Sequence, residues 1–371
     1  MKRLTASLVV YRNYTCNCSK TTFSITALPD PCRYYSGLYG TLEQDHAALR
    51  SRIPTPRPTI KVMDTIAELK SREIEADIVS ASIGAFLPLL EEKRTAIQEI
   101  PRKTFRYGST DRHQLDVYYP VAPSASEKTQ VLVWIYGGGF TTGERQFPPP
   151  ADLLYACVGA YFARRGFVVV IPDYRLLHDA IFPGGAEDVR DAILWTINNP
   201  AHLTTPTTPN PDTKGIFLMG HSAGAVYAFS AFVIPETAGS AILRPSIAGL
   251  ILCAGPYHLD ALDPADPLHD VAKQLCGGEQ GVQEKSPMGL LRDASDAVVA
   301  QFPRTVLVIA EREPDWLLAA DDAFAKALEA RTGKKPARIV AQGHNHISPN
   351  VALGTGQGEA WAEEVVTWIR S

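Results

Sequence analysis

The feature that most constrains the fold is a repeated alternation of short apolar runs with helical stretches between residues 103 and 370. A solidly apolar run such as 131–136 is typical of a strand buried on both faces of a sheet. Helical periodicity between such runs indicates helices that connect parallel strands. The sequence therefore predicts an α/β fold with a mostly parallel central sheet, helices on both faces and an antiparallel edge. The expected strands are 103–107, 114–119, 131–136, 167–171, 215–219, 247–253, 306–310 and 337–340, and the expected helices are 151–164, 186–198, 222–232, 315–331 and 358–370.

Residues 58–371 are expected to form a single domain, because strand and helix signals continue without a linker to the end of the sequence. Within it, apolar residues at three-to-four-residue steps predict a helical cap over 58–100, made of two helices that split near 80–84. Residues 255–301 interrupt the alternation with prolines and glycines. We expect this stretch to be an irregular insertion that forms a lid or part of a pocket.

Residues 1–57 differ in composition from the rest. The first acidic residue is Asp30, and basic residues before it stand among many serines and threonines. We interpret this segment as a poorly ordered N-terminal tail and linker, with a mitochondrial presequence as the alternative. Two patterns for N-glycosylation, at Asn13 and Asn17, matter only in a secreted protein. We expect a cytoplasmic location, with mitochondrial and secreted locations as the alternatives.

Composition excludes several classes of function. The 36 basic and 40 acidic side chains give a net charge of −4, which argues against a nucleic-acid partner. No apolar run reaches the ~18–20 residues of a membrane-spanning helix, so no membrane span is expected. The six cysteines form no CxxC pair, which argues against a disulfide framework or a structural zinc site. The oligomeric state stays open, a homodimer being one alternative.

The strongest chemical signal is Gly220-His221-Ser222-Ala223-Gly224, which follows an apolar run and opens an Ala-rich helix. This is the context of a nucleophile elbow, in which a tight turn exposes a serine hydroxyl above the carboxyl ends of the strands. The alternative is a chance match in a loop. The sequence predicts Ser222 as a nucleophile.

A serine hydroxyl needs a base, and an acid holds that base in place. If the chain order is serine, acid and histidine, both must follow Ser222. His344 and His346 both follow the last expected strand, and either could reach Ser222. A metal-binding HxH pair is the alternative, but further ligands are not evident. Three carboxylates follow the preceding strand and could hold the imidazole: Glu311, Glu313 and Asp315.

An oxyanion hole is predicted at Tyr136-Gly137-Gly138-Gly139-Phe140, which follows the apolar run 131–136. Glycines expose backbone N–H groups and let a substrate approach closely. The expected donors are the N–H groups of Gly138, Gly139 and Ala223. A phosphate-binding loop is the alternative, but neither GxGxxG nor GxxxxGKS spacing occurs here.

Together these motifs resemble the α/β-hydrolase fold, in particular its branch of hormone-sensitive-lipase-like and kynurenine-formamidase-like serine esterases. The resemblance covers roughly residues 100–371. It rests on Tyr136–Phe140, Asp173-Tyr174-Arg175-Leu176, Gly185-Ala186-Glu187-Asp188-Val189 with Trp195, Gly220–Gly224, Glu313-Pro314 and Asn345-His346-Ile347-Ser348.

The resemblance assigns roles residue by residue. Ser222 matches the nucleophile, Glu313 before a proline matches the acid, and His346 matches the base. Gly138, Gly139 and Ala223 match the oxyanion donors, while Asp315 and His344 are kept as alternates. Two positions depart from the family: Tyr136 stands where histidine is usual, and Glu313 where aspartate is commoner.

We therefore expect a serine hydrolase that cleaves carboxylic esters of small to medium acyl groups through an acyl-enzyme. The expected partner is a small-molecule ester, with no cofactor and no metal ion. One alternative is an arylformamidase acting on an N-formylkynurenine-type amide. Another is a catalytically silent member of the family that binds a small ligand.

Overall fold

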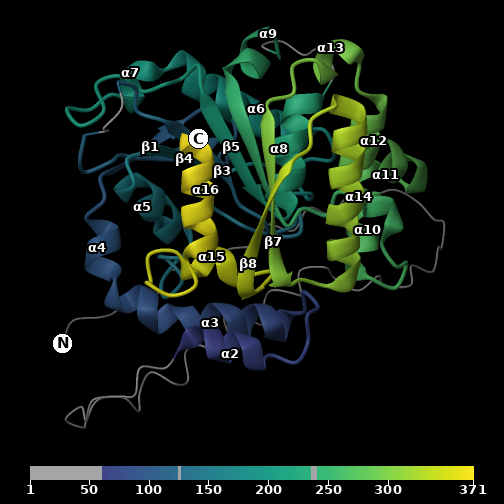
Figure 1. Cartoon of the computed structure of the whole chain (residues 1–371), viewed down its shortest axis with the longest axis horizontal. Coiled ribbons are helices and arrows are strands. Elements are labelled where there is room, and N and C mark those ends of the chain that lie inside the picture. The colour runs from purple at the N-terminus through teal and green to yellow at the C-terminus, as the bar shows by residue number, and fades with distance from the viewer. Residues whose placement is uncertain (1–60, 124–126, 235–239) are drawn as a thin grey trace, which may run out of the picture. The chain divides into compact units, whose positions relative to one another are not determined.

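The structure is a computed structural model that describes residues 61–123, 127–234 and 240–371. The expected tail and both glycosylation patterns lie outside these residues. The described residues contain a sheet of eight strands in the order β1-β2-β4-β3-β5-β6-β7-β8 (Figure 1). The bounds are β1 Arg102–Arg106, β2 Gln114–Tyr118, β3 Val131–Ile135, β4 Val168–Pro172, β5 Ile216–His221, β6 Ile247–Cys253, β7 Arg304–Arg312 and β8 Ala337–Asn345.

The pairing of the strands confirms the predicted α/β class. β2 pairs antiparallel with both β1 and β4, and every other neighbouring pair is parallel. Every residue of β3 and β4 is buried, as the apolar runs predicted. β8 pairs only with β7, and its burial alternates along the strand. This strand extends to Asn345, five residues past its expected end, because an edge strand can carry polar residues.

Helices cover both faces of the sheet (Figure 1). On one face α5 packs beside α16, where Glu363 accepts hydrogen bonds from Tyr161 and Arg165. On the other face α6 packs against α8, and α12 packs against both α8 and α14. The bounds are α5 Ala156–Arg164, α6 Gly184–Asn198, α7 Pro200–Leu203, α8 Ala223–Val233, α9 Ser240–Leu243, η2 Arg244–Ser246, α14 Asp315–Thr332, α15 Ser348–Ala352 and α16 Ala360–Arg370.

The segment before β1 is helical, but it divides at a different point from the one predicted. Its helices are α2 (Val62–Glu68), α3 (Ala76–Glu92) and α4 (Arg94–Gln98). The expected split near 80–84 is wrong, because α3 continues through these residues. Within that stretch Ser82 is buried, and its hydroxyl donates to the Ile78 carbonyl one turn earlier. α2 packs against β8 and α3 against α15, so the segment lies beside the end of the last strand.

Residues 255–301 are more regular than the prolines and glycines predicted. They contain η3 (Leu259–Ala261), α10 (Pro267–Cys276), α11 (Glu279–Lys285), α12 (Pro287–Asp293) and α13 (Asp296–Val299). Asp266, Ser286 and Ser295 cap α10, α12 and α13 by accepting N–H hydrogen bonds. A lid function for this insertion stays a prediction. Among the described helices, none combines the length and the apolar character needed to cross a membrane.

Candidate active site

Ser222 occupies a sharp turn between β5 and α8. Its backbone has φ 54° and ψ −124°, a conformation rare for a residue with a side chain. The turn packs closely on its neighbours, since a Cβ at Gly224 would lie 2.2 Å from the Ile135 carbonyl oxygen and one at Gly220 2.3 Å from the Gly224 carbonyl oxygen. The Ser222 N–H donates to the Cys253 carbonyl at 2.8 Å, which ties the turn to β6. Only glycine fits on either side of this strand-to-helix turn.

His346 and Glu313 meet Ser222 from two other strand ends. His346 follows the last residue of β8, and its Nε2 lies 2.9 Å from Ser222 Oγ. Its Nδ1 lies 2.7 Å from Oε2 of Glu313, which follows β7. Both side chains are buried. Because the carboxylate can only accept at Nδ1, the imidazole presents its unprotonated Nε2 to the serine hydroxyl.

The backbone around His346 is held by Asn345. The Asn345 Oδ1 accepts the N–H groups of Ile347 and Ser348 at 3.2 and 3.0 Å. Its Nδ2 donates to Ser82 Oγ at 2.7 Å, which connects the turn that carries His346 to α3. The side chain that precedes the base thus fixes the turn after β8 and links it to the helical segment before β1.

The other candidate residues lie elsewhere. The two nitrogens of His344 pair with Ser348 Oγ at 2.8 Å and the Gly358 carbonyl at 2.7 Å, and burial lowers its pKa to about 4. Asp315 opens α14 with its side chain 95% exposed, 3.7 Å from Arg72. Glu311 accepts the N–H of Gly343. The structure therefore brings His346 and Glu313 to Ser222. The other three candidates, His344, Asp315 and Glu311, pair with residues elsewhere.

The Gly-rich loop after β3 runs alongside Ser222. A Cβ at Gly137 would lie 2.8 Å from the Cβ of Ser222. Gly138 and Gly139 have φ 135° and 58°, and the Gly138 carbonyl accepts the N–H groups of Thr141 and Thr142. Within the described residues, no hydrogen bond takes up the N–H groups of Gly138, Gly139 or Ala223. The predicted oxyanion donors are therefore not used in hydrogen bonds among the described residues.

Tyr136 anchors the start of that loop. Its hydroxyl donates to Asp173 Oδ1 at 2.7 Å and accepts from Arg112 Nη2 at 2.9 Å. The hydroxyl of Tyr174 donates to the Tyr136 carbonyl at 2.9 Å. Burial and the Asp173 carboxylate raise the pKa of Tyr136 well above its usual value, so the hydroxyl stays protonated. The tyrosine that departs from the family pattern thus joins a buried hydrogen-bond network.

Sequence reasoning missed the two arginines of this network. Arg145 binds Asp173 through its backbone N–H and its guanidinium, and Arg112 also donates to the Gly143 carbonyl. The signal that could have pointed to a network was Asp173, an acid directly after a fully apolar strand, which needs a partner when buried. Nothing in the sequence showed which cations would reach it.

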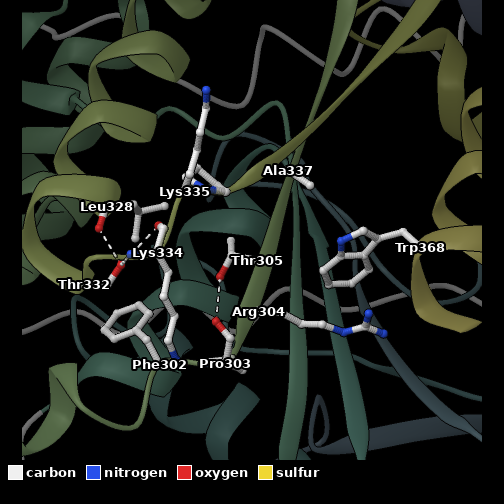
Figure 2. A pocket seen from close by; sticks show the side chains of 11 residues that line it. Phe302, Pro303, Arg304, Thr305, Leu328, Thr332, Lys334, Lys335, Ala337 and Trp368 are labelled. Carbon is white, nitrogen blue, oxygen red and sulfur yellow. Dashed lines mark hydrogen bonds between the residues drawn. The ribbon is translucent and has the colours of Figure 1, made fainter. Parts of the chain in front are cut away.

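Two cavities lie away from these residues. One of about 300 Å³ lies at the start of β7 and β8, between Lys334, Phe302 and the Arg304–Trp368 pair (Figure 2). The other, of about 430 Å³, lies between α12 and α14. Neither is lined by Ser222, Glu313 or His346. In the described ranges, no group of three or more His, Cys, Asp or Glu is placed to hold a metal ion.

The BD-FAE family model matches residues 115–234, a span that contains the Gly-rich loop and Ser222 and ends before Glu313 and His346. Its match therefore bears on the first half of the site only.

Curated relatives match over less than half of the chain. The bile salt-activated lipase of Mus musculus is 29% identical over 178 residues, which cover 44% of this chain and 28% of the relative. The probable carboxylesterase M8 of Phoma sp. is 31% identical over 143 residues, 36% of this chain and 43% of the relative. The chain spans less than half the length of either relative.

Solved structures match over more of the chain. The esterase of Pyrobaculum calidifontis superposes with a TM-score of 0.59 at 18% identity, and the match covers 83% of this chain and 97% of that one. Such a match at this identity shows that the two chains share a fold.

Proposed function

We propose that this chain, which has the α/β-hydrolase fold expected from its motifs, is a serine hydrolase that cleaves carboxylic esters of small to medium acyl groups without a cofactor. One observation carries the proposal. A continuous hydrogen-bond chain joins Ser222 Oγ to His346 Nε2 at 2.9 Å and His346 Nδ1 to Glu313 Oε2 at 2.7 Å. A base within hydrogen-bond reach of a hydroxyl, oriented by a buried acid, is what serine nucleophiles require.

The first half of the reaction forms an acyl-enzyme. Ser222 Oγ attacks the ester carbonyl carbon while His346 Nε2 takes the hydroxyl proton. The carbonyl oxygen becomes an oxyanion that accepts hydrogen bonds from the N–H groups of Gly138, Gly139 and Ala223. When this intermediate collapses, the bond to the alcohol oxygen breaks, and His346 returns the proton to the leaving alcohol.

Water completes the reaction by the same route. His346 Nε2 takes a proton from water as the water oxygen attacks the acyl carbon, and the oxyanion forms in the same place. Collapse of the intermediate breaks the bond to Ser222 Oγ, which regains its proton from His346. Throughout, the Glu313 carboxylate accepts the Nδ1–H, which stabilises the imidazolium that exists in each intermediate.

The similarity to proteins named carboxylesterase and lipase favours an ester as the substrate class. The proposal includes a cytoplasmic protein whose partner is a small-molecule ester rather than a nucleic acid, which fits its net charge of −4. It leaves a homodimer open.

The test compares wild type, Ser222→Ala and Ser230→Ala on p-nitrophenyl esters from acetate to decanoate. Wild type should hydrolyse the shorter esters fastest, and Ser222→Ala should lose roughly a million-fold in kcat. Ser230 lies on α8 in a buried position, without a hydrogen-bond partner for its hydroxyl among the described residues. Its loss should leave kcat within about twofold.

Two outcomes would overturn the proposal. If N-formylkynurenine is hydrolysed much faster than any ester, the enzyme is a formamidase with the same site. If folded wild-type protein hydrolyses no ester and a fluorophosphonate does not label Ser222, the chain is not a serine hydrolase.

A further inference from the structure

His221, the last residue of β5, precedes the nucleophile and touches the base. Its side chain is buried, and its Nε2 lies 2.9 Å from the backbone carbonyl oxygen of His346. The two imidazole rings lie side by side, with centroids 4.9 Å apart and planes tilted by 40°. In the sequence, this histidine stands out only as the second residue of the Gly220–Gly224 motif, which predicts no role for its side chain.

The hydrogen bond fixes the state of the His221 ring. A carbonyl oxygen can only accept, so Nε2 must carry the proton. Burial, with a smaller contribution from His346, lowers the pKa of His221 to about 3, and the ring is therefore neutral at neutral pH. A neutral ring beside the base adds no positive charge that would oppose the imidazolium forming on His346.

The other edge of the ring faces the Gly-rich loop. A Cβ added at Gly137 would lie 3.2 Å from His221 Nδ1 and 3.0 Å from the His221 carbonyl oxygen. His221 therefore fills the space between the start of that loop and the turn that carries His346. A single buried side chain contacts two of the loops that meet at Ser222, and it is the last residue of the serine's own strand.

We propose that His221 is a positioning residue, whose Nε2–H holds the His346 carbonyl so that the base stays within reach of Ser222 Oγ. This inference rests on the proposed function of the same site. His221 transfers no proton in the reaction. Its removal should let the turn after β8 shift, and a small displacement of a general base lowers the rate of the chemical step.

The decisive comparison is between His221→Gln and His221→Asn. The glutamine amide nitrogen is four bonds from Cα, as is the histidine Nε2, whereas that of asparagine is three bonds away. Glutamine can therefore donate to the His346 carbonyl, and asparagine cannot reach it. His221→Leu removes the donor altogether, and His269→Leu, at a buried histidine on α10, controls for burying leucine in place of an imidazole.

Rates should be measured on the best p-nitrophenyl ester and expressed per active site titrated with a fluorophosphonate, so that unfolded protein does not count. His221→Asn and His221→Leu should lower kcat about tenfold, the effect of losing roughly 1.4 kcal/mol from one hydrogen bond, with KM unchanged. His221→Gln should recover most of kcat, and His269→Leu should leave it unchanged.

The inference is overturned if the three His221 variants have equal kcat per active site, since shape rather than the donor would then matter. It is also overturned if KM rises while kcat stays constant, or if neither His221→Asn nor His221→Leu yields folded protein. An inactive wild type that resists phosphonylation refutes the proposed function, and this inference falls with it. An active wild type with insensitive His221 variants refutes this inference alone.

Discussion

Glu313 contacts the imidazole of His346 through one of its two carboxylate oxygens. Oε2 binds the imidazole of His346, whereas Oε1 is buried with no hydrogen-bond partner among the described residues. A buried carboxylate with so few partners is costly unless its charge is compensated nearby. The imidazole that becomes positive during the proposed reaction supplies that compensation. The acid and the base are therefore best paired when the base is protonated.

Replacing this charge should damage the chemical step severely. We expect Glu313→Gln to lower kcat by roughly 10³–10⁴-fold, because a neutral amide neither holds the required tautomer nor stabilises the imidazolium. Asp315→Asn is the matched control, since that carboxylate is 95% exposed. Its kcat should stay within about twofold. Steady-state kinetics on one ester measure kcat of both variants. A larger loss of kcat in Asp315→Asn than in Glu313→Gln would contradict the assignment of Glu313 as the acid.

At the residue scale, the sequence predicted the candidate site, but residue patterns alone left two histidines and three carboxylates as alternatives until the family resemblance was considered. His344 and His346 are two positions apart, and so are Glu313 and Asp315. Which member of each pair faces Ser222 depends on where a strand stops. β8 ends at Asn345, so His344 still belongs to the strand, whereas His346 belongs to the turn. The end of an edge strand depends on tertiary pairing, which residue patterns do not report.

At the scale of elements, the Gly-rich loop depends on residues far along the chain. The Tyr136 ring stacks between Tyr155 and Tyr174, with centroids 5.3 and 4.8 Å away. Its hydroxyl and the Asp173 carboxylate bring together β3, the segment after β4, and Arg112 from the turn before β2. These contacts fix the direction in which the chain leaves β3 and enters the loop.

Tyr136→Phe keeps the stacked ring and removes the hydroxyl. Asp173 and Arg112 then each lose a buried partner, so the free energy of unfolding should fall by about 1–3 kcal/mol. We also expect a lower kcat, since the loop loses an anchor next to the oxyanion donors. The control is Tyr118→Phe in β2, whose hydroxyl has a long 3.4 Å contact with Arg102. Urea unfolding and ester kinetics measure both; an effect in Tyr136→Phe no larger than in the control would contradict this role.

The elements themselves were predictable where burial is uniform. β3 and β4 are apolar throughout because both of their faces are covered. The continuous α3 was not predicted, since small residues around Ser82 suggested a break. The Asn345 amide gives the buried Ser82 hydroxyl a hydrogen-bond partner from a distant part of the chain, and local helix propensity does not account for such a contact.

At the scale of the whole molecule, two of the buried histidines among the described residues, His221 and His344, have lowered pKa values. Burial lowers their pKa values to about 3 and about 4, against 6.5 for an ordinary histidine. Below pH 6.5 the unfolded chain therefore binds protons that the folded chain does not. Global stability is highest above that pH and decreases as the pH falls toward 4.

The contribution of His344 to this loss should be about 3 kcal/mol when complete. We expect the free energy of unfolding of wild type, from urea titrations between pH 7 and pH 4, to fall more steeply than that of His344→Gln. His178→Gln is the control, because His178 is 64% exposed. It should follow the wild-type curve. Parallel curves for wild type and His344→Gln would show that His344 does not contribute.

The backbone of Ser222 has a consequence for how this chain can evolve. A residue with a side chain at φ 54° and ψ −124° costs of order 1–3 kcal/mol, which glycine would not incur. Selection for thermal robustness alone would therefore favour glycine at position 222 and a silent protein. The serine persists only while its chemistry is selected, so a functional lineage cannot relax the strain of this turn.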